Sequence, residues 1–83
     1  MNNIIIYSTP SCPYCNMAKH LLKSLELSYR DIDVSKNPKK LEDLIKKTKM
    51  QTVPQIFINK KFIGGFDDLN RLKQNNELKN ILK

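Results

Sequence analysis

Two cysteines, Cys12 and Cys15, are the residues of this 83-residue chain whose type and spacing best suit chemistry. Pro13 and Tyr14 separate them, and the chain has no third cysteine. On a helical turn, side chains at i and i+3 lie about 5–6 Å apart at Cβ, which a disulfide can close. A disulfide across so short a loop removes little entropy from the unfolded chain. The pair is therefore predicted to be a redox dithiol rather than a structural cross-link.

The position of the pair predicts different roles for the two sulfur atoms. An apolar run at residues 4–7 precedes it and an amphipathic helix follows. Pro13 suits the first helical position, so Cys12 is the expected N-cap residue and Cys15 the third helical residue. An N-cap sulfur can accept hydrogen bonds from the N–H groups of Tyr14 and Cys15, and the helix dipole favours its thiolate. We expect Cys12 to be the nucleophile, a thiolate near neutral pH, and Cys15 to be the resolving thiol.

A zinc site is the alternative use of a cysteine pair. Structural zinc takes four ligands, and His20 is the only histidine that could join the two cysteines. Its place five residues after Cys15 fits a solvated helix face. No metal site is predicted.

Length and composition predict one domain over residues 1–83. We expect this domain to act as a monomer. The hydrophobic content of 40% suits a globular fold, and no stretch approaches the roughly 20 apolar residues of a membrane span. The first residues lack the pattern of a signal peptide. A reducing cytoplasm is the expected location, where a Cys-x-x-Cys pair is more often catalytic than structural.

The net charge of +7 comes from 15 basic and 8 acidic residues. The lysines are scattered over several predicted elements, and the aromatic residues do not alternate with them as in a stacking platform. Nucleic-acid binding is therefore not predicted. A positive surface would still attract anionic ligands and acidic partners.

The hydrophobic pattern predicts the order β-α-β-α-β-β-α. The first strand is continuous in apolar residues, as expected for one covered on both faces. The β-α-β unit makes the first two strands parallel, and a turn at Asn59-Lys60 makes the last two antiparallel. The expected fold is α/β, a small four-stranded mixed sheet with helices on both faces. The predicted strands are residues 4–7, 28–34, 53–58 and 61–63; the predicted helices begin at Pro13, at Asn37-Pro38 and at a cap on Asp67 or Asp68, and a short helical segment lies at 78–82.

Three motifs at matching spacing make the chain resemble the glutaredoxins, thioredoxin-fold oxidoreductases that use glutathione. Cys12-Pro13-Tyr14-Cys15 is similar to the dithiol active site of that family. Thr52-Val53-Pro54 is similar to its Thr-Val-Pro loop, whose proline is cis. Gly64-Gly65-Phe66-Asp67-Asp68-Leu69 is similar to its Gly-Gly-x-(Ser/Asp)-Asp-Leu segment. The resemblance covers essentially the whole chain.

The resemblance implies a set of glutathione contacts. Pro54 would lie opposite the dithiol, so that the backbone of Val53 could pair with the cysteinyl backbone of glutathione. The helix that starts near Phe66 would bind the γ-glutamyl carboxylate through its free N–H groups, with an Asp side chain on the ammonium. The implied glutathione-binding residues are Tyr14, Thr52, Val53, Pro54, Gly65, Phe66, Asp67 and Asp68.

One position departs from the family pattern. Many glutaredoxins carry Lys three residues before the first cysteine, and here that position is Thr9. The activation of Cys12 would then rest more on the helix terminus. Lys19, Lys39 and Lys40 are candidates to replace the missing charge.

The implied activity is reduction of glutathione mixed disulfides and protein disulfides, with glutathione as co-substrate and no tightly bound cofactor. A thioredoxin-like protein with its own reductase is one alternative, but its usual Trp-Cys-Gly-Pro-Cys site needs a Trp that the chain lacks. A second alternative is a dimer that holds a [2Fe–2S] cluster through Cys12 and glutathione. In the family that role goes mainly with Cys-Gly-Phe-Ser sites, so Pro13 disfavours it.

Overall fold

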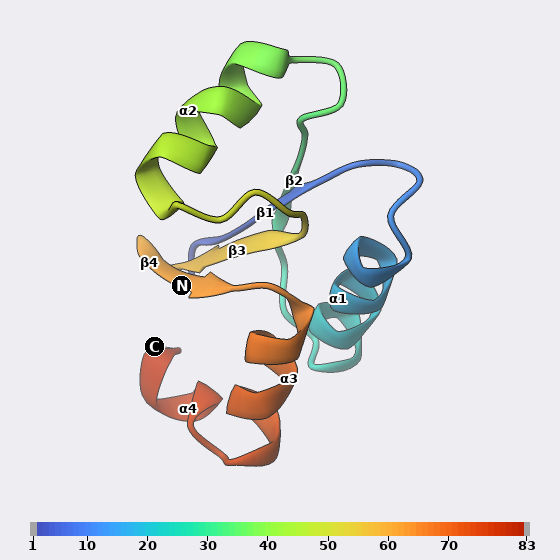
Figure 1. Cartoon of the computed structure of the whole chain (residues 1–83). Coiled ribbons are helices and arrows are strands. Elements are labelled where there is room, and N and C mark those ends of the chain that lie inside the picture. Colours follow the sequence, from blue (N-terminus) through green and yellow to red (C-terminus); the bar gives the residue numbers. More distant parts are fainter. Residues whose placement is uncertain (1, 83) are drawn as a thin grey trace.

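The computed structural model describes residues 2–82. Its elements follow the predicted order, with a short fourth helix at the end (Figure 1). The elements are β1 (Ile4–Ser8), α1 (Pro13–Ser24), β2 (Arg30–Asp33), α2 (Pro38–Thr48), β3 (Gln55–Ile58), β4 (Lys61–Gly64), α3 (Phe66–Gln74) and α4 (Leu78–Ile81).

The four strands form one mixed sheet in the order β2-β1-β3-β4. β1 runs parallel to β2 and antiparallel to β3, and β3 runs antiparallel to β4. Asn59 and Lys60 form the β3–β4 turn with φ of 51° and 72°. Two successive positive φ angles match the twist of a tight hairpin. The predicted mixed sheet and its turn are confirmed.

Helices cover both faces of the sheet, as predicted. In Figure 1, α2 lies over one face, and α1, α3 and α4 lie over the other. The main core forms on the second face and contains Ile4, Ile6, Ala18, Leu22, Ile56, Ile58, Leu69 and Leu78. β1 is only partly covered on the α2 side, because Ile5 and Tyr7 are half-buried while Ile4, Ile6 and Ser8 are buried. Both faces of this strand are covered, as predicted, with closer burial on the α1 side.

Two strands begin later than predicted. β2 starts at Arg30, the residue that pairs with Ile5 of β1. β3 starts at Gln55 because Pro54 has no N–H to give to a sheet ladder, and the peptide bond before it is cis.

The cap of α3 also differs from the prediction. Gly65 is the N-cap residue, in place of Asp67 or Asp68. Asp68 stands at the third helical position, and its Oδ2 accepts the N–H of Gly65 at 3.1 Å. The carboxylate thus satisfies a free donor from inside the helix, as the acidic member of a capping box does.

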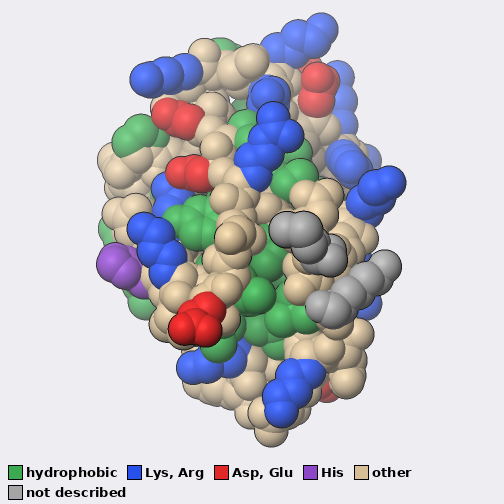
Figure 2. Space-filling view, turned by 180° about the vertical axis from the view of Figure 1, so that it is seen from behind, with side chains coloured by type: hydrophobic (Ala, Val, Ile, Leu, Met, Phe, Trp, Pro, Cys, Tyr) green, Lys and Arg blue, Asp and Glu red, His purple; other side chains and the backbone are tan. Residues whose placement is uncertain are grey.

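Figure 2 draws one face of the molecule, and charged side chains are not collected in one place on this face. Figure 2 shows Lys and Arg side chains from one end of that face to the other, with uncharged atoms between them. Within residues 2–82 no helix has the length and apolar character of a membrane span, and α1, the longest, has 12 residues.

Candidate active site

The start of α1 places the two sulfur atoms as predicted. Cys12 is the N-cap residue, with extended backbone angles, and Pro13 opens the helix. The Cys15 N–H donates to Cys12 Sγ at 3.2 Å. Of the two predicted donors, Tyr14 and Cys15, this is the one that the structure pairs with the sulfur. Both cysteines are free thiols, and Cys12 is half-buried.

Cys15 is fully buried, with 0% of its surface exposed. Burial first, and the hydrogen bond with Cys12 second, raise the pKa of Cys15 to about 12. Two smaller effects oppose this rise in pKa: a backbone hydrogen bond with Thr9 and the charge of Lys19. Cys15 therefore keeps its proton at neutral pH. The prediction of a shielded second thiol is confirmed, and the raised pKa agrees with the prediction that this thiol is protonated.

The loop that precedes β3 faces the dithiol. The Val53-Pro54 peptide bond is cis. The Cys12 thiol donates to the carbonyl oxygen of Val53, with 3.6 Å between Sγ and O. Val53 itself precedes the strand, so its backbone is not part of the sheet ladder. Both parts of the prediction for this loop, the cis bond and the orientation toward Cys12, are confirmed.

The side chain of Gln55 forms hydrogen bonds that fix the loop before β3. Its side chain is fully buried, and its Nε2 donates to the carbonyl oxygens of Met50 at 2.6 Å and Thr52 at 3.0 Å. Its Oε1 accepts the Thr48 hydroxyl at 2.8 Å. Sequence reasoning missed this residue. The available signal was a long polar side chain at the start of an otherwise apolar strand, where a buried amide must find partners.

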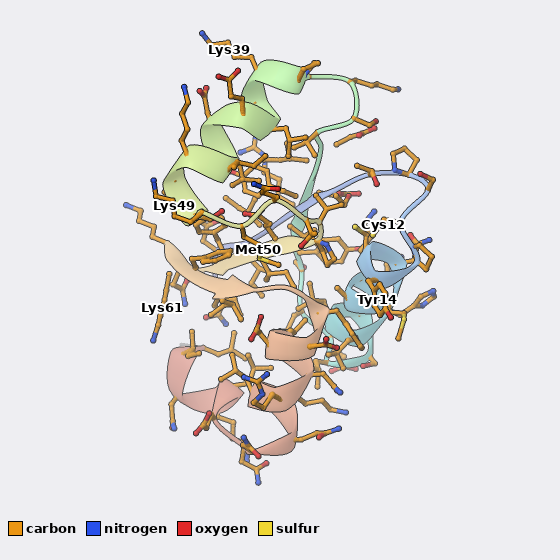
Figure 3. The ribbon with its side chains drawn as sticks, in the orientation of Figure 1. Cys12, Tyr14, Lys39, Lys49, Met50 and Lys61 are labelled. Atoms are coloured by element: carbon orange, nitrogen blue, oxygen red, sulfur yellow. The ribbon has the colours of Figure 1, made fainter. Side chains whose placement is uncertain are left out.

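A cavity of about 340 Å³ lies beside the dithiol. All eight residues predicted to bind glutathione line it: Tyr14, Thr52, Val53, Pro54, Gly65, Phe66, Asp67 and Asp68. The structure therefore brings α1, the cis-proline loop and the start of α3 to one place. Met50 is a ninth lining residue that the sequence did not reveal; Figure 3 shows it on the loop before β3, with Tyr14 on α1. The Tyr14 side chain is 58% exposed, and its ring lies 6.4 Å from that of Phe66.

The start of α3 forms one wall of the cavity. Gly64 has a φ of 119°, and a Cβ there would collide with the Asp68 carboxylate, so glycine is required. Asp68 accepts the N–H of Gly65 through Oδ2, and its Oδ1 forms an ion pair with Arg71 Nη1 at 3.5 Å. Asp67 is exposed and has neither an ion pair nor a side-chain hydrogen bond to residues 2–82. Asp67 is the freer carboxylate of the two.

Of the three lysines considered as substitutes for the charge missing at Thr9, Lys19 is engaged by another side chain and Lys39 lies apart from Cys12. The Lys19 ammonium pairs with Asp31 at 2.7 Å. Lys39 extends from the start of α2, well apart from Cys12 (Figure 3). The hydrogen bond that Cys12 Sγ accepts comes from the start of α1.

Within residues 2–82, no group of three or more His, Cys, Asp and Glu side chains is arranged to hold a metal ion. His20 is exposed, as predicted, and projects at the edge of the molecule in Figure 2.

A dithiol at a helix start, facing a cis-proline loop across a cavity on a four-stranded mixed sheet, defines a thiol oxidoreductase of the thioredoxin-like fold. Comparison with known proteins narrows this class. Residues 4–63 match the sequence model of the family described as Glutaredoxin. The chain is 43% identical to Glutaredoxin 3 of Escherichia coli (strain K12) over 83 residues, with 100% of each chain covered.

Solved structures agree with this result. The buckwheat glutaredoxin–glutathione complex has a TM-score of 0.92 and 28% identity, covering 98% of this chain and 76% of its own. Glutaredoxin from Brucella melitensis has a TM-score of 0.87 and 38% identity, covering 98% and 88%. The chain belongs to the glutaredoxin family and is a glutathione-dependent thiol oxidoreductase.

Proposed function

We propose that this protein reduces glutathione mixed disulfides and protein disulfides through Cys12 and Cys15. The observation that carries the proposal is the unequal placement of the two thiols. Cys12 caps α1 and accepts the N–H of Cys15, whereas Cys15 is buried and holds its proton. The Cys12 sulfur is therefore available to attack a substrate disulfide, and the buried Cys15 sulfur can act only in a later step.

The first reaction needs only Cys12. Its thiolate attacks the glutathione sulfur of a mixed disulfide, and the protein thiolate leaves and takes up a proton. A thiolate of a second glutathione then attacks the glutathionyl sulfur, which frees Cys12 and forms glutathione disulfide. In the second reaction, the Cys12 thiolate attacks one sulfur of a protein disulfide, and the other sulfur leaves as a thiolate that takes up the proton of Cys15. Within the same chain, where its effective concentration is high, Cys15 then displaces the partner sulfur bound to Cys12.

Glutathione is proposed to occupy the cavity beside the dithiol. The Val53 backbone would pair with its cysteinyl backbone, and that pairing would take the place of the present bond from Cys12 to the Val53 carbonyl. The first N–H groups of α3 suit a carboxylate, and Asp67 is the free carboxylate for an ammonium. Tyr14 and Phe66 would form an aromatic wall. The related buckwheat glutaredoxin was solved as a complex with glutathione, which supports glutathione as the ligand.

The setting follows from the chemistry. A catalytic dithiol must be reduced again after each cycle, so we propose a reducing cytoplasm with glutathione as electron donor and a role in cell redox homeostasis and electron transport. The protein would act as a single domain over residues 1–83, as a monomer on glutathionylated or disulfide-containing proteins. Nucleic acid and membranes have no part in the proposal.

Turnover of a small glutathionylated disulfide, with glutathione and glutathione reductase, tests this function. Cys12→Ser should abolish this activity and the reduction of a protein disulfide. Cys15→Ser should keep much of the first activity and lose most of the second. Loss of deglutathionylation in Cys15→Ser, with Cys12→Ser active, would reverse the two roles. An absorbance spectrum of anaerobically purified protein tests the cluster-binding alternative, since a cluster is coloured and a bare dithiol is not.

A further inference from the structure

Side chains from three elements meet in an ion-pair network on the inner side of α1. Lys19 Nζ of α1 lies 2.7 Å from Asp31 Oδ2 of β2. The other oxygen of that carboxylate, Oδ1, accepts the hydroxyl of Ser8, the last residue of β1, at 2.5 Å. Ser8 is buried, so this hydrogen bond fixes the carboxylate from the core side. One oxygen of Asp31 therefore binds Lys19, while Ser8 holds the other oxygen and so fixes the orientation of the carboxylate.

Lys19 stands one helical turn beyond Cys15. Residues at i and i+4 share a helix face, with Cβ atoms about 5–6 Å apart. The Lys19 side chain is 20% exposed, whereas Lys46, in the i,i+4 pair with Glu42 on α2, is 70% exposed. Water screens the enclosed ammonium less than the exposed one. Lys19 can therefore act on the buried thiol beside it.

The charges around Lys19 all favour its protonated form. The hydrogen bond with Asp31, and then the charge of the same carboxylate, raise the pKa of Lys19. Partial burial of Lys19 lowers this pKa, and the charges of Tyr29 and Cys15 raise it further. Lys19 therefore stays an ammonium and does not serve as a base. In return it lowers the pKa of Cys15, as the Thr9 backbone does, against the larger effects of burial and Cys12.

We propose that Lys19, held by Asp31 and Ser8, is a positioning residue for the resolving step: its ammonium stabilises the thiolate that Cys15 becomes as it attacks the Cys12 mixed disulfide. This inference rests on the proposed function of the dithiol. Lys19, Asp31 and Ser8 do not line the glutathione cavity. They would take part in the reduction of protein disulfides but not in deglutathionylation.

The step balances as follows. Cys12 thiolate attacks a disulfide of the partner protein, which forms the Cys12 mixed disulfide and releases one partner thiolate. Cys15 gives its proton to that thiolate and attacks Cys12 Sγ; the Cys12–Cys15 bond forms, and the bond to the second partner sulfur breaks and leaves a thiolate. Two electrons pass from the dithiol to the partner. Deglutathionylation by a second glutathione does not use Cys15 and gains nothing from Lys19.

The resolving step can be measured directly. Cys12 of the full chain is loaded with 5-thio-2-nitrobenzoate, and release of the coloured thiolate reports the attack by Cys15 as a function of pH, with Cys15→Ser as the blank. Lys19→Gln should slow release about threefold at neutral pH, because the loss of Cys15 thiolate is partly offset by the stronger nucleophile that a higher pKa gives, and it should move the rate profile to higher pH. Asp31→Asn should have the same direction of effect. Lys19→Arg should restore the rate, and Lys46→Gln, which breaks the exposed pair of α2, should match the wild type.

Deglutathionylation of a small substrate by the same variants separates this role from a structural one. It should stay unchanged in Lys19→Gln. An unchanged release profile, an equal loss of both activities, or a loss in Lys19→Arg as large as in Lys19→Gln would overturn the inference. If Lys19→Gln does not fold, the release profiles of Asp31→Asn and Lys19→Arg decide by the same criteria. Failure of the proposed function would instead appear as a wild-type protein without deglutathionylation.

Discussion

At the scale of single residues, two neighbouring carboxylates at the start of α3 divide their work. Asp68 accepts the Gly65 N–H and pairs with Arg71, so its side chain is committed to the helix start. Asp67 lines the same cavity and has no such partner within residues 2–82. A side chain without an internal partner is the better candidate for the ammonium of a ligand.

The division predicts opposite behaviour in two variants. Asp68→Ala should lower the free energy of unfolding by about 1 kcal/mol, the net value of one hydrogen bond. The melting temperature should fall by about 4–8 °C for a chain of this size. Asp67→Asn should leave the melting temperature nearly unchanged and raise the KM for glutathione about tenfold, because a charge-assisted bond is lost.

Thermal unfolding and steady-state kinetics of the two variants check this pair of outcomes. Asp67→Asn with wild-type glutathione kinetics would remove Asp67 from the binding site. A KM change in Asp68→Ala without loss of stability would mean that Asp68 meets the ligand directly.

At the scale of elements, the loop between α2 and β3 depends on one buried side chain. Gln55 bonds to the backbone of Met50 and Thr52 and to the hydroxyl of Thr48, so it ties the loop to the first residue of β3. The loop carries Val53 and Pro54, which face Cys12. The shape of the cavity is therefore linked to an amide that never lines it.

Replacing this amide should disturb the site from a distance. Gln55→Leu would leave two backbone carbonyls without their donor and should destabilise the fold by about 1–3 kcal/mol. The KM for glutathione should rise more than kcat falls, since the loop and not the dithiol is displaced. Gln51→Leu, an exposed change in the same loop, is the matched control and should behave as the wild type. Equal kinetic effects in both variants would show that Gln55 does not position the loop.

At the scale of the whole molecule, the buried thiol ties stability to alkaline pH. Cys15 has a pKa of about 12 in the folded protein, against a usual value of 9.0. As pH rises above 9.0, an unfolded chain loses this proton while the folded protein keeps it. The folded state then binds more protons than the unfolded state, so its stability falls with rising pH.

The expected result is a denaturant midpoint that declines from about pH 9 upward, more steeply in the wild type than in Cys15→Ser. The comparison of the two slopes removes the contribution of the lysines, which both proteins share. Parallel slopes would mean that Cys15 is not held protonated by the fold.

The sequence by itself determined the features that depend on neighbouring residues. Cys12 as N-cap follows from Pro13 and the helix pattern, and the turn at Asn59-Lys60 follows from Asn59, a residue type that is enriched at positive φ. Such features are encoded within a few positions of the chain, because capping and turn geometry are local. The element order and the directions of the β1–β2 and β3–β4 pairs were also predicted, whereas the pairing of β1 with β3 was not. The cis bond at Pro54 was predicted from the family resemblance and not from the residues alone.

Only the tertiary structure decided which distant side chains meet. The partners of Gln55, the place of Met50 in the cavity and the bond between Ser8 and Asp31 depend on residues that folding brings together, and no local pattern identifies these partners. The N-cap of α3 is Gly65 for a related reason. The backbone at Gly64 lies close to the Asp68 carboxylate, which accepts the N–H of Gly65. A buried polar group must find a partner, but the chain's path through space determines which one.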